Sequence, residues 1–172
     1  MSIIQSNKRG GTINRSNGAT LIEVLIATLV LAVGLLGLAG LQATSIKNNL
    51  SAYKRSQATQ LAYDLADRMR ANRNESINLT TGNVITTSTY LTMAPTAAVA
   101  QTNCTTVTGC SSAQMAQHDL FQWNAALNTA LPGGTGTIAV ATNVFTITIT
   151  WDDNSDGVIN ASDPNFAVSF QP

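Results

Sequence analysis

The first strong pattern along the chain is an uncharged apolar run from Val24 to Leu41. The run holds 18 residues and is interrupted only by Thr28 and three glycines. In a helix that rises 1.5 Å per residue, this length covers about 27 Å, close to the thickness of the hydrocarbon layer of a membrane. The run therefore predicts one membrane-spanning helix.

A helical pattern continues beyond this run, because apolar or long side chains recur at steps of three and four residues. One predicted helix therefore extends from about Thr20 to Asn72, with pairs of opposite charge at Asp64–Arg68 and Asp67–Arg70. We expect its second half to pack one face on a globular domain. The residues of this predicted face are Leu50, Tyr53, Gln57, Leu61, Leu65 and Met69.

Residues 74–110 have a different composition, with 11 threonines between Thr80 and Thr108 and no charged residue in that interval. Few large apolar side chains are present, so we expect a long irregular segment with a short strand near residues 84–92. A second helix is predicted to begin at Ser111 or Ser112 and to end before the sequence Pro132-Gly133-Gly134. Its apolar face contains Ala116, Leu120, Trp123, Leu127 and Leu131.

Alternating apolar and polar residues predict strands at 137–141 and 144–151, joined by a short turn, and a last strand around 166–170. The buried face of the second strand would contain Phe145, Ile147, Ile149 and Trp151. The expected fold class is therefore α+β, with a long N-terminal helix packed on a small antiparallel sheet and one additional helix.

Charge is distributed unevenly along the 172 residues, although nine basic and nine acidic residues give a formal net charge of zero. All nine basic residues lie within residues 1–73, whereas residues 74–172 contain six acidic residues and no Lys or Arg. A domain without basic residues lacks the charge that attracts a phosphate backbone, so this part of the chain is not expected to bind nucleic acid.

The N-terminal region explains part of this asymmetry. Residues 1–18 are polar and carry a charge of +3, which would hold them in the cytoplasm by the positive-inside rule. A Sec signal peptide is an alternative, but its apolar region is shorter and ends at a small-x-small cleavage site. Neither a signal peptide nor a simple anchor explains Glu23, since a carboxylate at the edge of a spanning segment needs a partner.

The sequence GATLIEVLIA at residues 18–27 resembles the class III signal of type IV pilins and pseudopilins. This resemblance implies that a prepilin peptidase cleaves between Gly18 and Ala19 and then methylates the amino group of Ala19, a position where the family usually has Phe or Met. It also implies that Glu23 faces the positively charged N-terminus of a neighbouring subunit during assembly. Gly34, Gly37 and Gly40 then indicate either close helix packing or a segment that can unwind in a filament.

The resemblance divides the chain into a leader (1–18), a spanning and assembly half of the helix (19–45), a periplasmic half (46–73) and a C-terminal globular domain (74–172). Several residues of that domain resemble a narrower group, the PilV family of minor pilins that modify type IV pili. The matching positions are Ala116, Asp119-Leu120, Trp123, Leu127, 131–134 and 147–151.

Cys104 and Cys110 are the only cysteines in the chain. If the residues beyond the membrane are periplasmic, two cysteines six positions apart favour a disulfide over a metal site. A catalytic dithiol would more often have two residues between its cysteines.

The sequence DDNSDGVINASD at residues 152–163 has the spacing of a calcium loop. Oxygen ligands at loop positions 1, 3 and 5, a glycine at 6, a carbonyl at 7 and an acid at 12 are typical of EF-hand-type sites. A strand rather than a helix precedes the loop and Pro164 follows it, so an Asx/Gly turn without metal is the alternative. The candidate ligands are Asp152, Asn154, Asp156, the Val158 carbonyl, Asn160 and Asp163.

Together these features predict a non-enzymatic minor pilin of the bacterial inner membrane, later found in an extracellular pilus. The resemblance implies adhesion and twitching motility as processes, and prepilin peptidase, major and minor pilins and the inner-membrane assembly platform as partners. A minor pseudopilin of type II secretion is the first alternative. An anchored periplasmic enzyme is the second, but no nucleophile motif or metal cluster supports it, and the lone His118 favours a surface or capping role.

Overall fold

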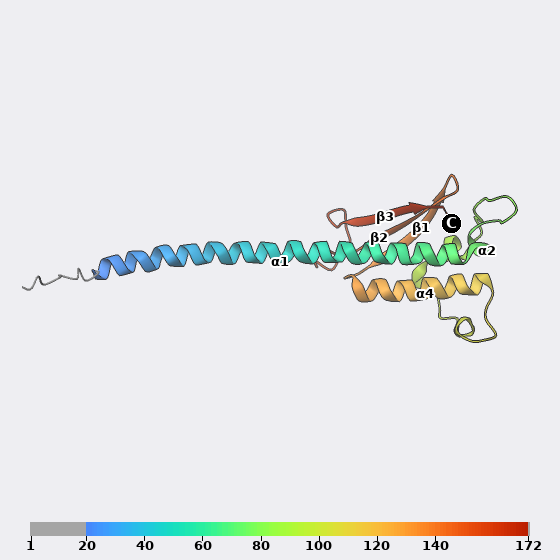
Figure 1. Ribbon diagram of the computed structural model, residues 1–172, viewed down its shortest axis with the longest axis horizontal. Helices are drawn as coiled ribbons and strands as arrows, with labels where there is room; N and C mark the ends of the chain where they lie inside the picture. The colour runs from blue at the N-terminus through green and yellow to red at the C-terminus, as the bar shows by residue number, and fades with distance from the viewer. Residues whose placement is uncertain (1–19, 172) are drawn as a thin grey trace, which may run out of the picture. The chain divides into compact units, whose positions relative to one another are not determined.

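The computed structural model describes residues 20–171 and shows a chain of two compact units that divide between Ser45 and Ile46. Figure 1 shows its helices and strands. The first unit contains the N-terminal half of helix α1 (Leu21–Ala71), and the second contains the rest of α1 and all other elements. The predicted leader and Ala19 lie outside the described residues.

Helix α1 spans 51 residues, so the predicted helix from Thr20 to Asn72 is confirmed to within one residue at each end. Arg68 and Arg70 occupy its last turn, where positive charge interacts favourably with the helix dipole. The buried hydroxyl of Ser76 donates a hydrogen bond of 2.9 Å to the carbonyl of Met69, which satisfies one of the final carbonyls. The short helix α2 (Arg73–Ser76) follows.

The buried face of α1 differs from the predicted one. Leu50 and Tyr53 are 52% and 59% exposed, so this part of the prediction is wrong. Alanines make up three of the six buried residues instead, and these small side chains allow other elements to approach the helix closely. The buried residues are Lys54, Ala58, Ala62, Leu65, Ala66 and Met69.

The segment after α2 contains short helical turns where a strand was expected near residues 84–92. Helix α3 (Thr89–Thr92) replaces that strand, and only one isolated β-bridge, between Ile77 and Val84, forms in this part of the segment. The reason is local, because the Ser88 hydroxyl accepts a hydrogen bond from the Tyr90 backbone N–H and starts a helical turn. Two 3₁₀ turns follow, η1 (Pro95–Ala97) and η2 (Thr102–Thr105).

Helix α4 (Ser112–Ala130) begins with a capping box, in which the side chains of Ser111 and Gln114 bond each other's backbone N–H groups. The predicted apolar face of this helix is confirmed, since all five of its residues are buried. Gly133, at a φ of 59°, lies in the turn that leads from the helix to the sheet.

Three antiparallel strands form a sheet in the order β1 (Thr135–Ala141), β2 (Val144–Thr150) and β3 (Asn165–Phe170). Thr142 and Asn143 both have positive φ, at 51° and 63°, as a two-residue hairpin turn requires. The predicted strands are thus confirmed, with small changes at their ends.

The core of the second unit lies between α1, α4 and the inner face of the sheet. Trp123 of α4 is fully buried and its indole N–H donates a 2.9 Å hydrogen bond to the Leu61 carbonyl of α1. The alternating residues of β2 and Trp151 after it are also fully buried. The α+β class predicted from the sequence is therefore confirmed, with a long helix packed on a small antiparallel sheet and one additional helix.

Candidate functional site

The first unit begins with a capped helix turn that contains Glu23. The Thr20 carbonyl accepts a 3.0 Å hydrogen bond from the Glu23 backbone N–H, and the Thr20 hydroxyl lies 3.4 Å from the same nitrogen. Thr20 and Glu23 have the spacing of a capping box, which the sequence analysis did not identify although the pattern T-x-x-E could have revealed it. The predicted cleavage and methylation site at Gly18 and Ala19 lies outside the described residues.

The rest of this unit is apolar on every side. An 18-residue window of α1 has a mean hydropathy of 2.6 and no part of it is buried within the chain. The two threonine hydroxyls donate to carbonyls of their own helix, Thr28 to Leu25 at 2.9 Å and Thr44 to Gly40 at 3.1 Å. The helix therefore has the length and composition to cross a membrane, and these hydroxyls need no outside partner.

Helix α1 continues without interruption through Gly34, Gly37 and Gly40. A Cβ atom placed on any of the three would meet no other atom within 4 Å in the described structure. Contacts within the chain therefore do not require these glycines. Close packing against another helix and local unwinding both remain as interpretations of their role.

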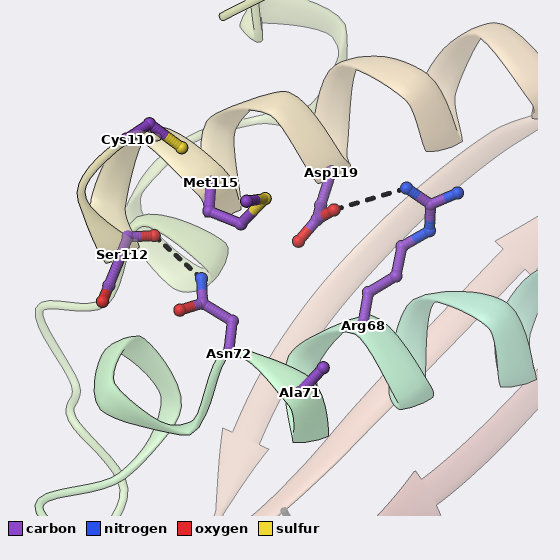
Figure 2. A pocket seen from close by; sticks show the side chains of 7 residues that line it. All are labelled: Arg68, Ala71, Asn72, Cys110, Ser112, Met115 and Asp119. Carbon is purple, nitrogen blue, oxygen red and sulfur yellow. Dashed lines mark hydrogen bonds and ion pairs between the residues drawn. The ribbon is translucent and has the colours of Figure 1, made fainter. Parts of the chain in front are cut away.

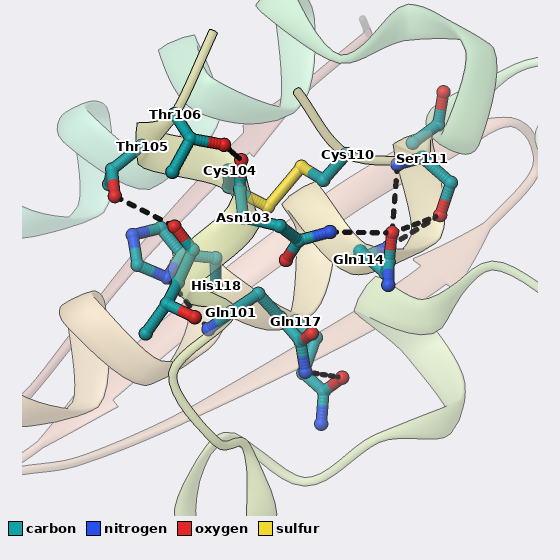
Figure 3. Close-up of a disulfide and its surroundings, with 12 residues drawn as sticks. Gln101, Asn103, Cys104, Thr105, Thr106, Cys110, Ser111, Gln114, Gln117 and His118 are labelled. Carbon is teal, nitrogen blue, oxygen red and sulfur yellow. Dashed lines mark hydrogen bonds between the residues drawn. A yellow bond between two sulfur atoms is a disulfide. The ribbon is translucent and has the colours of Figure 1, made fainter. Parts of the chain in front are cut away.

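The predicted disulfide is present in the second unit, where it closes a loop that directly precedes α4 in the sequence (Figure 3). The sulfur atoms of Cys104 and Cys110 are 2.10 Å apart. Ser111, the residue directly after Cys110, is the N-cap of α4, so the disulfide loop ends where this helix begins. Val107 is fully exposed within the loop.

In the acidic loop of residues 152–163, the carboxylates accept hydrogen bonds from backbone N–H groups of the same loop. Asp152 accepts hydrogen bonds from the N–H groups of Asp156 and Gly157, at 3.2 and 2.8 Å. Asp163 accepts from Asp153 and from Asn160, at 3.1 and 2.9 Å, and so joins the two ends of the loop. Among residues 20–171, no three His, Cys, Asp or Glu side chains form a group that could hold a metal ion.

The remaining candidate ligands also take part in these turns. The Asp156 carboxylate accepts a hydrogen bond from the Val158 backbone N–H at 2.9 Å. The side-chain oxygen of Asn154 accepts one from the Asp156 backbone N–H at 2.9 Å. Asn160 accepts from Ser162 at 2.9 Å. The hydrogen bond from Val158 is the main cause that lowers the pKa of Asp156 below its ordinary value, because it favours the charged carboxylate.

Lys54 connects α1 to this loop. Its side chain is only 7% exposed, and its ammonium group donates to the Asp153 carbonyl at 2.9 Å and lies 3.4 Å from the Asp153 carboxylate. Burial opposes the charge on Asp153, yet hydrogen bonds from Ser51 and Trp151 and the charge of Lys54 outweigh it and lower its pKa. This contact was not predicted from the sequence, because the two residues are 99 positions apart.

A second missed group lies beside a cavity of about 310 Å³ between α1 and α4 (Figure 2). The buried carboxylate of Asp119 accepts a 2.6 Å hydrogen bond from the Tyr90 hydroxyl and lies 3.3 Å from the Arg68 guanidinium. Burial raises the pKa of Tyr90 well above its ordinary value, and the hydrogen bond to Asp119 adds to the effect. Arg68 also contacts Asp64 at 2.9 Å, so the predicted Asp64–Arg68 pair is part of this network.

The predicted pair between Asp67 and Arg70 is confirmed as well, at 2.7 Å. The Arg70 guanidinium also lies 4.9 Å from the centre of the Phe170 ring, a cation–π contact between α1 and the last strand. These surface pairs contribute little stability individually, since water screens exposed charges.

Two models of known families match parts of this chain. The family model of the prokaryotic N-terminal methylation motif matches residues 13–39, and the model of the Tt1218-like family, described as type IV pilin Tt1218, matches residues 40–121. Residues 13–121 of the chain are thus similar to type IV pilins. Neither the curated proteins nor the solved structures contain a significant match.

This similarity accounts for the features of the first unit. The methylation motif covers Glu23, the capped first turn and most of the apolar run, and it implies processing by a prepilin peptidase and association with other pilins. Type IV pilins are structural proteins rather than enzymes. The motif and the apolar helix together indicate a pilin anchored in a membrane.

Proposed function

We propose that this pilin is a minor pilin that is incorporated into a type IV pilus or primes its assembly. Prepilin peptidase would remove residues 1–18 on the cytoplasmic side of the inner membrane and methylate Ala19. The assembly platform would then transfer the subunit to the filament, where it modulates pilus biogenesis, adhesion and twitching motility. The resemblance of residues 116–151 to the PilV family supports the assignment to minor pilins.

The observation that carries this proposal is the position of Glu23 at the start of an otherwise uncharged helix. Glu23 is the only acidic or basic residue between Thr20 and Ser45. A lone carboxylate that enters an apolar environment is costly, whereas a carboxylate paired with an opposite charge offsets its loss of hydration. The amino group of Ala19 on a neighbouring subunit would supply that charge, and the methyl group leaves it a cation.

Mass spectrometry of sheared, purified pili tests the processing and the location together. We expect a peptide that begins at Ala19 and carries the mass of one additional methyl group. The major pilin in the same sample is the control for recovery. Absence of the chain from pili, together with its presence in a type II secretion complex, would support the pseudopilin alternative instead.

The role of Glu23 is tested by Glu23→Ala, measured as the ratio of this chain to the major pilin in sheared pili. We expect normal cleavage and a large loss of incorporation, because the neighbouring amino group loses its partner. Asp67→Ala is the matched control, since it removes an exposed carboxylate of the same helix outside the first unit. Incorporation of Glu23→Ala at the wild-type ratio would contradict the proposed role.

We also propose that the loop of residues 152–163 binds calcium. Its donors are hard oxygen atoms of carboxylate, amide and carbonyl groups, the type that calcium prefers. To bind an ion, Asp152, Asp156 and Asp163 would have to turn away from the backbone N–H groups that they accept from in this structure. The expected affinity is therefore weak, in the millimolar to sub-millimolar range of extracellular sites.

Calorimetric titration of the mature chain with calcium tests this second proposal, with magnesium as the ionic control. We expect calcium-dependent heat and a higher unfolding temperature in calcium, both lost in Asp152→Asn/Asp163→Asn. Identical behaviour of the wild-type chain in calcium and in chelator would rule the site out.

A further inference from the structure

The cavity between α1 and α4 is lined by polar side chains from both helices (Figure 2). Its volume of about 310 Å³ is near the lower end of the range of ligand pockets, about 300–1,000 Å³. Arg68 and Asp119 bring opposite charges to its wall, and only 8% of the Asp119 side chain is exposed. Ala71 and Met115 add an apolar surface. A small apolar surface with a few convergent polar groups is typical of a ligand site.

Two oxygen atoms of this wall have free capacity to accept hydrogen bonds. A carboxylate has about four lone-pair sites, and Asp119 uses two of them, for Tyr90 at 2.6 Å and for Arg68 at 3.3 Å. The amide nitrogen of Asn72 donates to the Ser112 carbonyl at 2.8 Å, which fixes the orientation of this amide. In the part of the chain that the structure describes, no group donates to the side-chain oxygen of Asn72. A ligand that donates from two neighbouring atoms would satisfy both oxygens.

The charges of the wall restrict the ligand further. An ammonium group in the cavity would lie near the Arg68 guanidinium, and a carboxylate or phosphate would lie near Asp119, so an ion of either sign meets a like charge. The guanidinium has five N–H donors and makes three hydrogen bonds, to Asp64, Asp119 and Gln122. The matching ligand is therefore neutral, and it both donates and accepts hydrogen bonds. Hydroxyl groups do both.

A neutral amide is the competing chemistry, because it also donates and accepts. Its donors lie on a single nitrogen, whereas the free acceptors belong to Asn72, directly after α1, and to Asp119 on α4. Neighbouring hydroxyls of a sugar ring can donate separately to the two oxygens, while another hydroxyl accepts from Arg68. The C–H groups of the ring would then contact Met115. The distribution of acceptors over two helices thus favours a sugar over an amide.

We propose that this cavity binds one neutral sugar ring through the Asp119 carboxylate, the Asn72 side-chain oxygen and the Arg68 guanidinium. The ring is either a free monosaccharide or the terminal residue of a glycan. We expect a Kd in the millimolar range, because the ligand has few atoms. The site goes beyond the proposed role in a pilus, since it lies in the second unit and requires neither processing nor incorporation.

NMR titration of the full-length chain, labelled at its methionine methyl groups, tests the site. Micelles of a detergent without a sugar headgroup avoid competition for the cavity. We expect at least one of glucose, galactose and mannose to shift the Met115 signal saturably, while the signal of the fully buried Met69 stays constant. The methyl glycoside of that sugar should bind equally if the site recognises the end of a glycan, and not at all if it recognises the free sugar.

Charged forms of the same ring are the controls for the sign argument. Glucosamine in its ammonium form and glucuronate should bind roughly tenfold more weakly than the neutral sugar, because each meets a like charge. Absence of a saturable Met115 shift with all three neutral sugars would overturn the proposal. Equal or tighter binding of either charged ring, or a saturable shift with N-methylacetamide alone, would also overturn it.

Two variants separate binding from stability. Ala71→Phe fills the cavity from an exposed position and should abolish the Met115 response, whereas Ala52→Phe, at an exposed position of the same helix outside the cavity, should not. Asp119→Asn removes the charge that repels anions, so glucuronate should then bind more tightly than the neutral sugar. An unchanged Met69 signal verifies that each variant is folded. A sugar response that survives in Ala71→Phe, or an unchanged preference in folded Asp119→Asn, would contradict the site.

Discussion

The two halves of α1 show how one continuous helix can use apolar residues for opposite purposes. Residues 24–41 are uncharged, almost entirely apolar and exposed on all sides of the helix, whereas residues 46–71 bury one narrow face and expose the rest. Among residues 20–171 nothing buries the apolar surface of the first half, which is therefore available to lipid or to other subunits. The second half buries part of its apolar surface against the rest of the domain.

The size of the buried side chains marks this difference more clearly than hydrophobicity does. In the second half alanines make up three of the six buried residues, and large residues such as Leu50 and Tyr53 remain exposed. In the first half Leu and Val dominate every face, with glycines that meet no neighbouring atom. Small residues at a buried face thus indicate close intramolecular packing, and large residues on all faces indicate an external apolar environment.

The largest expected effect comes from Trp123→Ala, which removes a fully buried ring that joins α4 to α1. We expect the second unit to lose about 3–5 kcal/mol of unfolding free energy. Denaturant titration of the mature chain in micelles, followed by the fluorescence of the buried Trp151, measures it. Leu35→Ala in the first unit is the control, and an equal loss there would show that the two regions do not differ as described.

A matched pair of substitutions separates the two halves of α1 directly. Ala62→Leu places a larger side chain on the buried face and should cost about 1–3 kcal/mol of unfolding free energy. Ala32→Leu makes the same change in the first half, where no atom of the chain opposes it, and should leave that free energy unchanged. The same titration reads both variants, and a similar cost in both would contradict the contrast.

Gly37→Ala distinguishes the two interpretations of the glycines in the first half. It should favour the helix by about 1 kcal/mol without clashing with any atom of the described chain. If the glycine allows unwinding, the variant will be incorporated into pili normally, and circular dichroism of those pili will show more helix. If it serves close packing, incorporation into pili will fall while the helix content of the free chain stays the same.

The smallest expected effect is the response of the second unit to acid. The folded state lowers the pKa of Asp156, mainly through the hydrogen bond from Val158, so its contribution to stability is present above the ordinary pKa and lost as the pH falls through the folded value. Asp156→Asn keeps an acceptor but removes the charge. We therefore expect the variant to lose less unfolding free energy than the wild-type chain between pH 7 and pH 3, and an equal loss would exclude this role for Asp156.

Local patterns in the sequence predicted most of the elements, because helices and strands follow short-range periodicity. The ends of α1, the face of α4 and the alternation in β2 are examples. The predicted face of α1 was wrong because helical periodicity was read from the large apolar residues, whereas three of the buried residues are alanines beside larger exposed side chains. The expected strand near residues 84–92 failed because the cap at Ser88 outweighs the β preference of its threonines.

The contacts that the sequence did not reveal are long-range ones. The hydrogen bond between Tyr90 and Asp119 spans 29 positions, and that between Lys54 and Asp153 spans 99. No spacing rule connects such residues, since only the packing of α1 against α4 and against the acidic loop brings them together. The disulfide and the Glu23 motif were accessible because each is local in the sequence.

The hydroxyls of Thr28 and Thr44 have a consequence for how this helix changes its surroundings. Thr28 and Thr44 donate to carbonyls of their own helix, so moving the helix from lipid to a protein neighbour breaks none of their hydrogen bonds. Among the described residues of this unit, Glu23 is the one charged side chain, and its charge must be matched both before and after such a transfer. If this helix moves from a membrane into a filament, the hydroxyls of Thr28 and Thr44 therefore need no new partners, whereas the carboxylate of Glu23 does.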